Sequence, residues 1–128
     1  MINRSPSGGP YPFYHKGGEI SIVHYSGYGR DKNSLEEMMK LEGIHLKATK
    51  NSKYIMIETF QTVFTSDVID IFVMHLKELD IICNKLALVG LNTFSRILLR
   101  RKIKKEKIGF GISFFTDIDA AKDWLVSE

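Results

Sequence analysis

The sequence predicts a single α/β domain in which a mixed, mainly parallel sheet of about five strands packs against about four helices. Three observations support this prediction. The chain has 128 residues, of which 44% are hydrophobic and 26% charged, and this size and composition are typical of one globular core. After a strand hairpin, short apolar runs alternate with segments of helical periodicity, a pattern that favours parallel strands joined by crossover helices. The apolar runs are also too short for a transmembrane segment.

The first part of the chain predicts a lead-in and a hairpin. Residues 1–10 are rich in Pro, Gly and Ser, which predicts a flexible lead-in before a single domain at residues 11–128. Residues 11–16 and 19–26 predict two strands joined by Gly17-Gly18, because this pair tolerates positive φ in a tight turn. Asn33 or Ser34 is the predicted cap of the first helix, and Gly43 is its predicted weak point or end.

The remainder of the chain repeats strand and helix. Strands are predicted at residues 54–58, 85–89 and 110–115. Ser66 is the predicted cap of the helix that follows the first of these strands, and Thr116 with Asp119 has the spacing of a capping box before the last helix. The side chains predicted to form the core are Met38, Phe72, Leu76, Ile97, Leu98 and Trp124.

The net charge of +3 is distributed unevenly, because the bases gather near the end of the third predicted helix. That basic patch consists of Arg100, Arg101, Lys102, Lys104, Lys105 and Lys107, with Arg96 one turn before it. Cations there interact favourably with the helix dipole and keep the surface solvated. A docking face for an acidic protein is a second interpretation, and an anionic membrane or a nucleic acid is a third. We expect no nucleic acid, because no aromatic residue for base stacking occurs between Arg96 and Lys107.

Catalytic and metal-binding patterns are absent from the sequence. A single cysteine, Cys83, excludes an internal disulfide and is expected to be a buried, unreactive thiol. The four histidines have no spacing that would present two metal ligands together, so we expect neither a metal nor a cofactor. His75 is expected at the edge of the core with its hydrogen bonds satisfied. We find no set of acid, base and nucleophile, and the chain is predicted not to be an enzyme.

One turn has the character of an anion site. Gly90 closes a predicted parallel strand, and Asn92 and Thr93 then begin a helix whose first turn contains Arg96. The carboxyl ends of parallel strands are where ligands most often bind in open α/β sheets, and helix starts attract anions. Asn92, Thr93 and Arg96 are therefore a candidate anion site.

Three segments carry a resemblance to a known family. They are ALVGL at residues 87–91, SRILLR at residues 95–100 and FFTDIDAAKDWLV at residues 114–126. With the order of elements from Glu19 onward, these segments resemble the STAS-like domains, the SpoIIAA-like group that includes bacterial anti-sigma-factor antagonists. In that family a serine lies where a core strand leads into the second helix. The matching segment here is residues 64–68. The partner-binding or phospho-acceptor candidates at this helix start are Thr65, Ser66, Asp67 and Asp70.

The resemblance implies a non-enzymatic, cytoplasmic protein-interaction module in bacterial signalling or stress regulation. Its implied partner is a protein, such as a regulatory kinase or a sigma-factor regulator, and a homodimer is an open alternative. A carrier of a small apolar or lipid-like ligand, held between helices and sheet, is the second hypothesis. Its basis is the adaptable side chains of Met38, Met39, Met56 and Met74.

Overall fold

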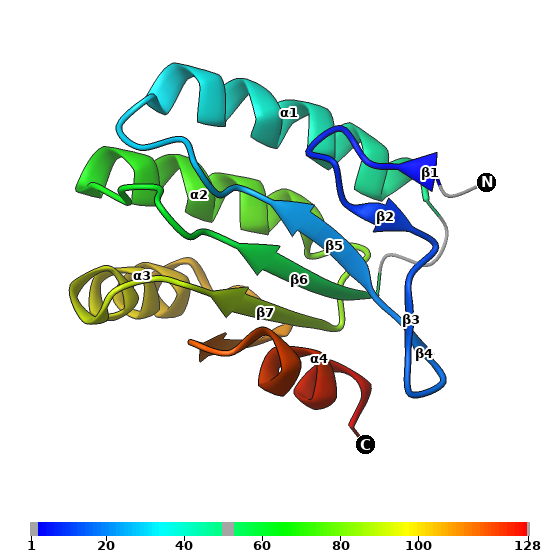
Figure 1. Cartoon of the computed structure of the whole chain (residues 1–128). Coiled ribbons are helices and arrows are strands. Elements are labelled where there is room, and N and C mark those ends of the chain that lie inside the picture. The colour runs from blue at the N-terminus through cyan, green and yellow to red at the C-terminus, as the bar shows by residue number, and fades with distance from the viewer. Residues whose placement is uncertain (1–2, 50–52, 128) are drawn as a thin grey trace.

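The computed structural model describes residues 3–49 and 53–127 and has a four-stranded parallel sheet at its centre (Figure 1). The strands lie side by side in chain order: β5 (Ser21–His24), β6 (Tyr54–Glu58), β7 (Lys85–Val89) and β8 (Gly111–Phe115). Each strand leads into a helix: α1 (Lys32–Ala48), α2 (Ser66–Leu79), α3 (Thr93–Glu106) and α4 (Ile118–Val126). The predicted α/β class and four helices are confirmed.

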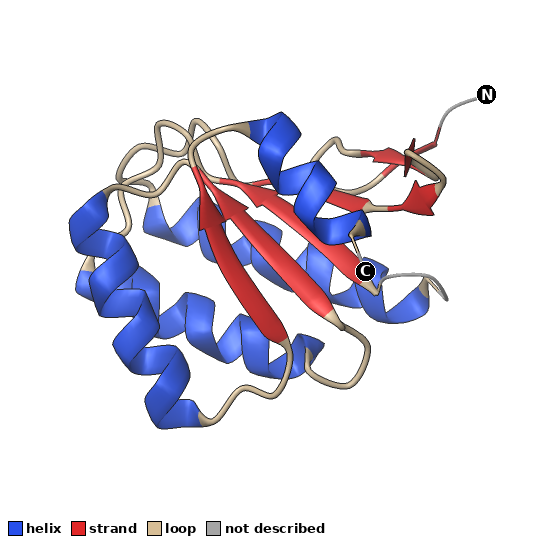
Figure 2. Cartoon of the chain, turned by 90° about the horizontal axis from the view of Figure 1, so that it is seen from below, coloured by secondary structure: helices blue, strands red, loops and turns tan. Residues whose placement is uncertain are grey.

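The helices form two layers around the sheet. Parallel strands joined in chain order by right-handed crossovers place their connecting helices on one face, and α1, α2 and α3 lie there. The last helix, α4, packs on the opposite face, against β6, β7 and β8 (Figure 2). Each face has its own core: Phe72 and Leu76 belong to the larger one, and Met56, Ala87 and Leu125 belong to the one beneath α4.

The predicted hairpin forms, but it lies outside the main sheet. β3 (Tyr14–His15) and β4 (Gly18–Glu19) pair only with each other, so the main sheet has four parallel strands and not about five in mixed directions. The turn is at Lys16 and Gly17, which both have positive φ, one position earlier than predicted. Gly18 instead meets α4 closely, since an added Cβ would lie 2.6 Å from Val126 Cγ1.

The start of the chain covers the β5 edge of the sheet. From residue 3 onward, the segment predicted as a flexible lead-in contains β1 (Asn3–Arg4) and β2 (Pro10–Tyr11), which pair antiparallel. Residues 1–2 lie outside the described residues. Between the strands, Ser5 is buried, and Gly9 approaches β5 so closely that a Cβ would overlap the Ile22 carbonyl oxygen. An edge strand needs such cover because its free backbone groups otherwise pair with other chains.

Burial confirms part of the predicted core. Phe72 and Leu76 are fully buried, and Met38, Leu98 and Trp124 are partly buried and pack against the two cores. Ile97 is wrong as a core residue, because its side chain is 44% exposed on the outer side of α3. Leu99 fills the inner position of that helix.

The caps of α1 and α4 differ from the predicted ones by one to three residues. α1 is capped by Asp31, whose Oδ1 accepts a hydrogen bond from Ser34 N at 3.1 Å, and the helix continues through Gly43. α4 is capped by Asp117, whose carboxylate accepts from Ala120 N, so Thr116 and Asp119 do not form a capping box. In both cases the aspartate preceding the helix reaches the free amide three residues on.

Candidate functional site

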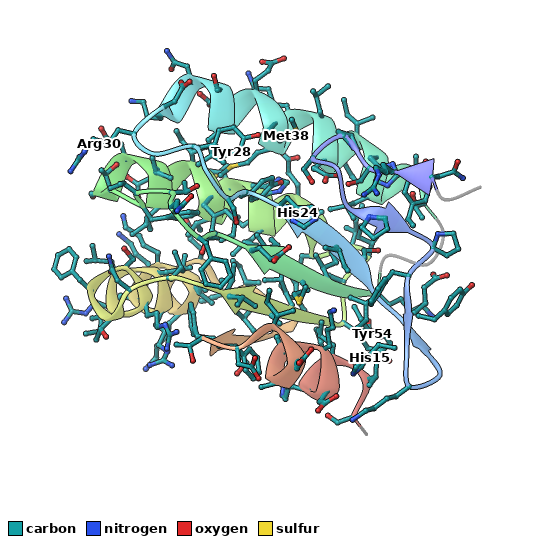
Figure 3. All side chains as sticks on the ribbon, viewed as in Figure 1. His15, His24, Tyr28, Arg30, Met38 and Tyr54 are labelled. Carbon is teal, nitrogen blue, oxygen red and sulfur yellow. The ribbon has the colours of Figure 1, made fainter. Side chains whose placement is uncertain are left out.

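The loops that follow the four parallel strands gather at one edge of the sheet (Figure 2). They are residues 25–31 before α1, 59–65 before α2, 90–92 before α3 and 116–117 before α4. Figure 3 shows Tyr28 and Arg30 at this edge. The predicted partner-binding and anion-site residues belong to these loops or to the first two turns of α2 and α3.

Hydrogen bonds fasten the loop before α2 to the loop before α1. Gly27 N donates to the Phe60 carbonyl at 2.8 Å, and Val63 N donates to the Gly29 carbonyl at 2.8 Å. Thr62 adds a side-chain bond, because its Oγ1 donates to the Tyr25 carbonyl and accepts from Tyr28 N. The loop at 59–65 therefore has a defined shape and presents its outward side chains in fixed positions.

Those outward side chains are both apolar and polar. Phe60 is 39% exposed and Val63 is 38% exposed. Ser66 and Asp67 follow directly and are exposed as well. We call Phe60, Val63, Thr65, Ser66 and Asp67 the α2-start surface.

The start of α2 is capped by Thr65 and not by Ser66. Thr65 Oγ1 accepts from Val68 N at 3.4 Å, and Ser66 is the first helical residue. Within the described residues the Ser66 hydroxyl makes no hydrogen bond, whereas both neighbouring aspartates are paired. Asp67 lies 3.9 Å from the Lys32 ammonium, and Asp70 lies 2.9 Å from that of Lys102. The sequence prediction therefore named the correct helix start but assigned the cap to the wrong hydroxyl.

The candidate anion site is brought together at the turn before α3, and the side chains of Asn92 and Arg96 make hydrogen bonds within the chain. Asn92 Oδ1 accepts from Ser95 N at 2.8 Å and so caps α3. Arg96 Nε donates to the Leu91 carbonyl at 3.0 Å. Gly90, with φ of 104°, lets the Phe60 ring approach, because an added Cβ would lie 2.9 Å from that ring. Thr93 remains exposed at the first helical position.

The basic patch lies along α3 and divides into two groups. Lys102 faces α2 and pairs with Asp70, and the Arg100 guanidinium lies 4.8 Å from the centre of the Phe114 ring. The second group is exposed, as Arg100 is, and has neither an ion pair nor a cation–π contact within the described residues: Arg101, Lys104, Lys105 and Lys107. Lys107 ends the helix with a left-handed φ of 55°, and its backbone amide donates to the carbonyls of the last turn.

A buried polar pair, which the sequence did not reveal, joins the sheet to α2. Tyr25 and His75 lie 2.7 Å apart between the Tyr25 hydroxyl and Nε2 of the imidazole, and both side chains are buried. Burial lowers the pKa of His75 to about 4, with Lys47 contributing, so the imidazole is neutral at pH 7. Burial also raises the pKa of Tyr25 well above its usual value, and the charge of Glu42 adds to this shift.

Glu42 is a second buried polar group on the same side of the sheet. Its side chain is fully buried in α1, where Oε2 accepts from Ser5 Oγ at 2.9 Å and from the backbone amide and hydroxyl of Ser7. Oε1 has no hydrogen-bond partner in the part of the chain that the structure describes. Glu42 thus holds the N-terminal hairpin against α1.

His75 also forms part of an open groove between α1 and α2. The groove has a volume of about 190 Å³ and is lined by Glu36, Met39 and Lys40 from α1 and by Ile71, Met74, His75 and Glu78 from α2. Gly43 is next to the imidazole, where an added Cβ would lie 3.7 Å from Cε1 of His75. Two of the four methionines proposed as ligand contacts therefore line one groove, whereas Met56 is buried on the other face of the sheet.

Two other titratable groups are paired or buried. His24 Nδ1 lies 2.5 Å from Glu58 Oε2 across neighbouring strands (Figure 3). Cys83 is buried as expected, and burial raises the pKa of its thiol to about 12. Within residues 3–49 and 53–127, no group of three or more His, Cys, Asp or Glu side chains could hold a metal ion. None of the helices described there is both long and apolar enough to cross a bilayer.

Comparison with protein-family models, with curated proteins and with solved structures finds no match for this chain. The class that the fold defines is an open α/β domain with one parallel sheet and helices on both of its faces.

Proposed function

We propose that this chain is a non-enzymatic protein-interaction module, similar to the STAS-like domains, that acts in bacterial signalling or stress regulation through its α2-start surface. The observation that carries this proposal is the exposure of Phe60 and Val63 beside the exposed Ser66 and Asp67. Apolar side chains bordered by polar ones are typical of surfaces that bind proteins. The loop is also held in shape by hydrogen bonds, so that little conformational entropy is lost when a partner binds.

A regulatory kinase fits the same surface as a partner. The Ser66 hydroxyl is exposed and has no hydrogen bond within the described residues, whereas Thr65 Oγ1 caps the helix. Phosphate on Ser66 would lie beside the free amides of a helix start, which favour an anion, and beside Asp67, which opposes one. We therefore propose Ser66, and not Thr65, as the phospho-acceptor.

The experiment is site-specific photo-crosslinking in cells that express the tagged chain from its native locus. A photoreactive phenylalanine analogue at Val63 is expected to capture a distinct protein, and the same analogue at Ile81 is the matched control. Ile81 is 81% exposed and follows the far end of α2. The expected crosslink disappears in the S66A and D67K double variant, because that variant changes the polar half of the surface. Identical crosslinks from both positions, or a crosslink that the double variant does not weaken, would contradict the proposal.

A small-ligand carrier is the second candidate, favoured by the groove between α1 and α2. Met39, Ile71 and Met74 give it apolar walls, and the neutral His75 gives it one polar group. Native mass spectrometry of the purified chain would show a bound small molecule. G43A is the matched variant, because the added methyl group would contact His75 and Glu78, which line the groove, and it should reduce the bound fraction. A spectrum of bare chain alone contradicts this candidate.

A further inference from the structure

One side of α3 is fastened to the molecule, and the other faces solvent. Ser95 and Leu99 are the buried residues of this helix, and Lys102 reaches across to Asp70 on α2. α3 lies at the end of the helix layer, next to α2 and away from α1 (Figure 1). Its outer side therefore has no neighbouring helix of that layer.

The outer side of α3 combines large apolar side chains with cations. Phe94 is 70% exposed, Ile97 is 44% exposed, and Arg101, Lys104 and Lys105 are exposed as well. With 3.6 residues per turn, these positions fall on one face of the helix. We call Phe94, Ile97, Arg101, Lys104 and Lys105 the α3 face. Its apolar half lies at the start of the helix and its cationic half at the end.

The cations of the α3 face are not neutralised by the rest of the described chain. The ion pairs of α3 use Lys102, which meets Asp70, and Glu106, which meets Lys77 on α2. No carboxylate within residues 3–49 and 53–127 lies within 4.0 Å of the charged nitrogens of Arg101, Lys104 or Lys105. Three adjacent positive charges are thus available to an external anion.

We propose that the α3 face binds the surface of a bilayer that contains anionic lipids. Such a surface offers acyl chains at the depth of Phe94 and Ile97, and anionic headgroups at the level of the cations. A nucleic acid would satisfy the charges but would leave Ile97 against phosphate and water. An acidic protein would need an apolar pocket placed beside its carboxylates. An anionic bilayer can contact the apolar half through its acyl chains and the cationic half through its headgroups, and it needs no pocket of matching shape. This binding uses a different surface from the α2-start surface and does not depend on the protein-interaction proposal.

The expected size of the effect follows from the charges. Each Lys or Arg near an anionic membrane surface changes the partition coefficient by about fivefold at moderate ionic strength. Removing the three cations of the α3 face should therefore weaken binding by about 100-fold, and higher salt should weaken it further.

The test is co-sedimentation of the full chain with vesicles of phosphatidylcholine alone or with about 30% phosphatidylserine, a content chosen to give a clearly negative surface potential. The R101E, K104E and K105E triple variant replaces the three cations with carboxylates, so its loss of binding should be at least the roughly 100-fold loss expected for their removal. R30E, K40E and K53E is its matched control, because it makes the same change of charge at exposed positions outside α3. F94S with I97S removes the apolar half, and I44S with I81S is the corresponding control at exposed isoleucines. Circular dichroism establishes that each variant is folded.

The proposal is supported if the chain sediments with the anionic vesicles only, if both α3 variants lose binding, and if both controls retain it. Equal binding to both vesicle types, or equal losses in the α3 variants and their controls, would overturn it. Absence of binding to vesicles overturns it too. Tighter binding to a 30-nucleotide oligonucleotide than to anionic vesicles would indicate that the α3 face binds nucleic acid, and it would refute the proposal of membrane binding.

Discussion

Replacing His75 with glutamine should remove a pH dependence from the stability of the fold. The imidazole of His75 on α2 is buried and hydrogen-bonded to the Tyr25 hydroxyl, and its pKa of about 4 compares with 6.5 for an exposed histidine. A base whose pKa is lowered by folding stabilises the native state fully only above its unfolded pKa. The free energy of unfolding therefore decreases as the pH falls from 6.5 towards 4, because in this range the unfolded chain binds a proton at His75 and the folded chain does not. Glutamine does not titrate and can still bond to Tyr25.

The magnitude follows from the two pKa values. The linkage relation gives a loss of about 2 kcal/mol in unfolding free energy from His75 between pH 7 and pH 5. This loss is large compared with the total stability of about 5–15 kcal/mol that is typical of a domain.

Urea unfolding at pH 7 and pH 5 measures the effect. Over this interval the free energy of unfolding of the unsubstituted protein should decrease by about 2 kcal/mol more than that of H75Q, because only the unsubstituted protein has the buried imidazole. H45Q is the control, since it removes a half-buried histidine from α1 and keeps His75. Equal pH dependence in the native chain and in H75Q would refute the buried, neutral state of this imidazole.

Three further predictions concern burial and capping. F72A should cost about 3–5 kcal/mol in urea unfolding, because it opens a cavity in the core, whereas I97A should change stability by less than about 0.5 kcal/mol. T65A should cost about 1 kcal/mol, because it removes the cap of α2, and S66A should cost far less; equal costs would contradict the observed cap. The Cys83 thiol should react with iodoacetamide at pH 8 only after urea unfolding, since burial raises its pKa to about 12, and rapid labelling of the folded chain would be the contrary result.

The elements that the sequence predicted well are those with a strong local pattern. Residues 54–58 and 85–89 are apolar runs of strand length, and both form the predicted strands. The second helix has an apolar side that includes Phe72 and Leu76, and this side is buried against the sheet. Periodicity predicts such elements because burial requires apolar side chains at a fixed spacing.

The helix caps and the core residue that were predicted wrongly each have a neighbour in the sequence that suits the same role about equally well. Asp31, Asn33 and Ser34 can all cap a helix, as can Thr65 and Ser66, and the backbone geometry of each loop selects one of them. Ile97 and Leu99 are equally apolar, and the position of α3 against α2 determines which of them is buried. Local sequence does not distinguish these alternatives, because their propensities are nearly equal.

The pattern of the chain alone determined the α/β class, the alternation of strand and helix, and the concentration of positive charge on one helix. Tertiary structure decided the contacts between distant residues. It paired Tyr25 with His75, placed Ser5 and Ser7 on the carboxylate of Glu42, and turned the α3 face towards solvent. Burial and hydrogen bonding between residues far apart in sequence depend on how whole elements pack, and local propensity contains no term for that packing.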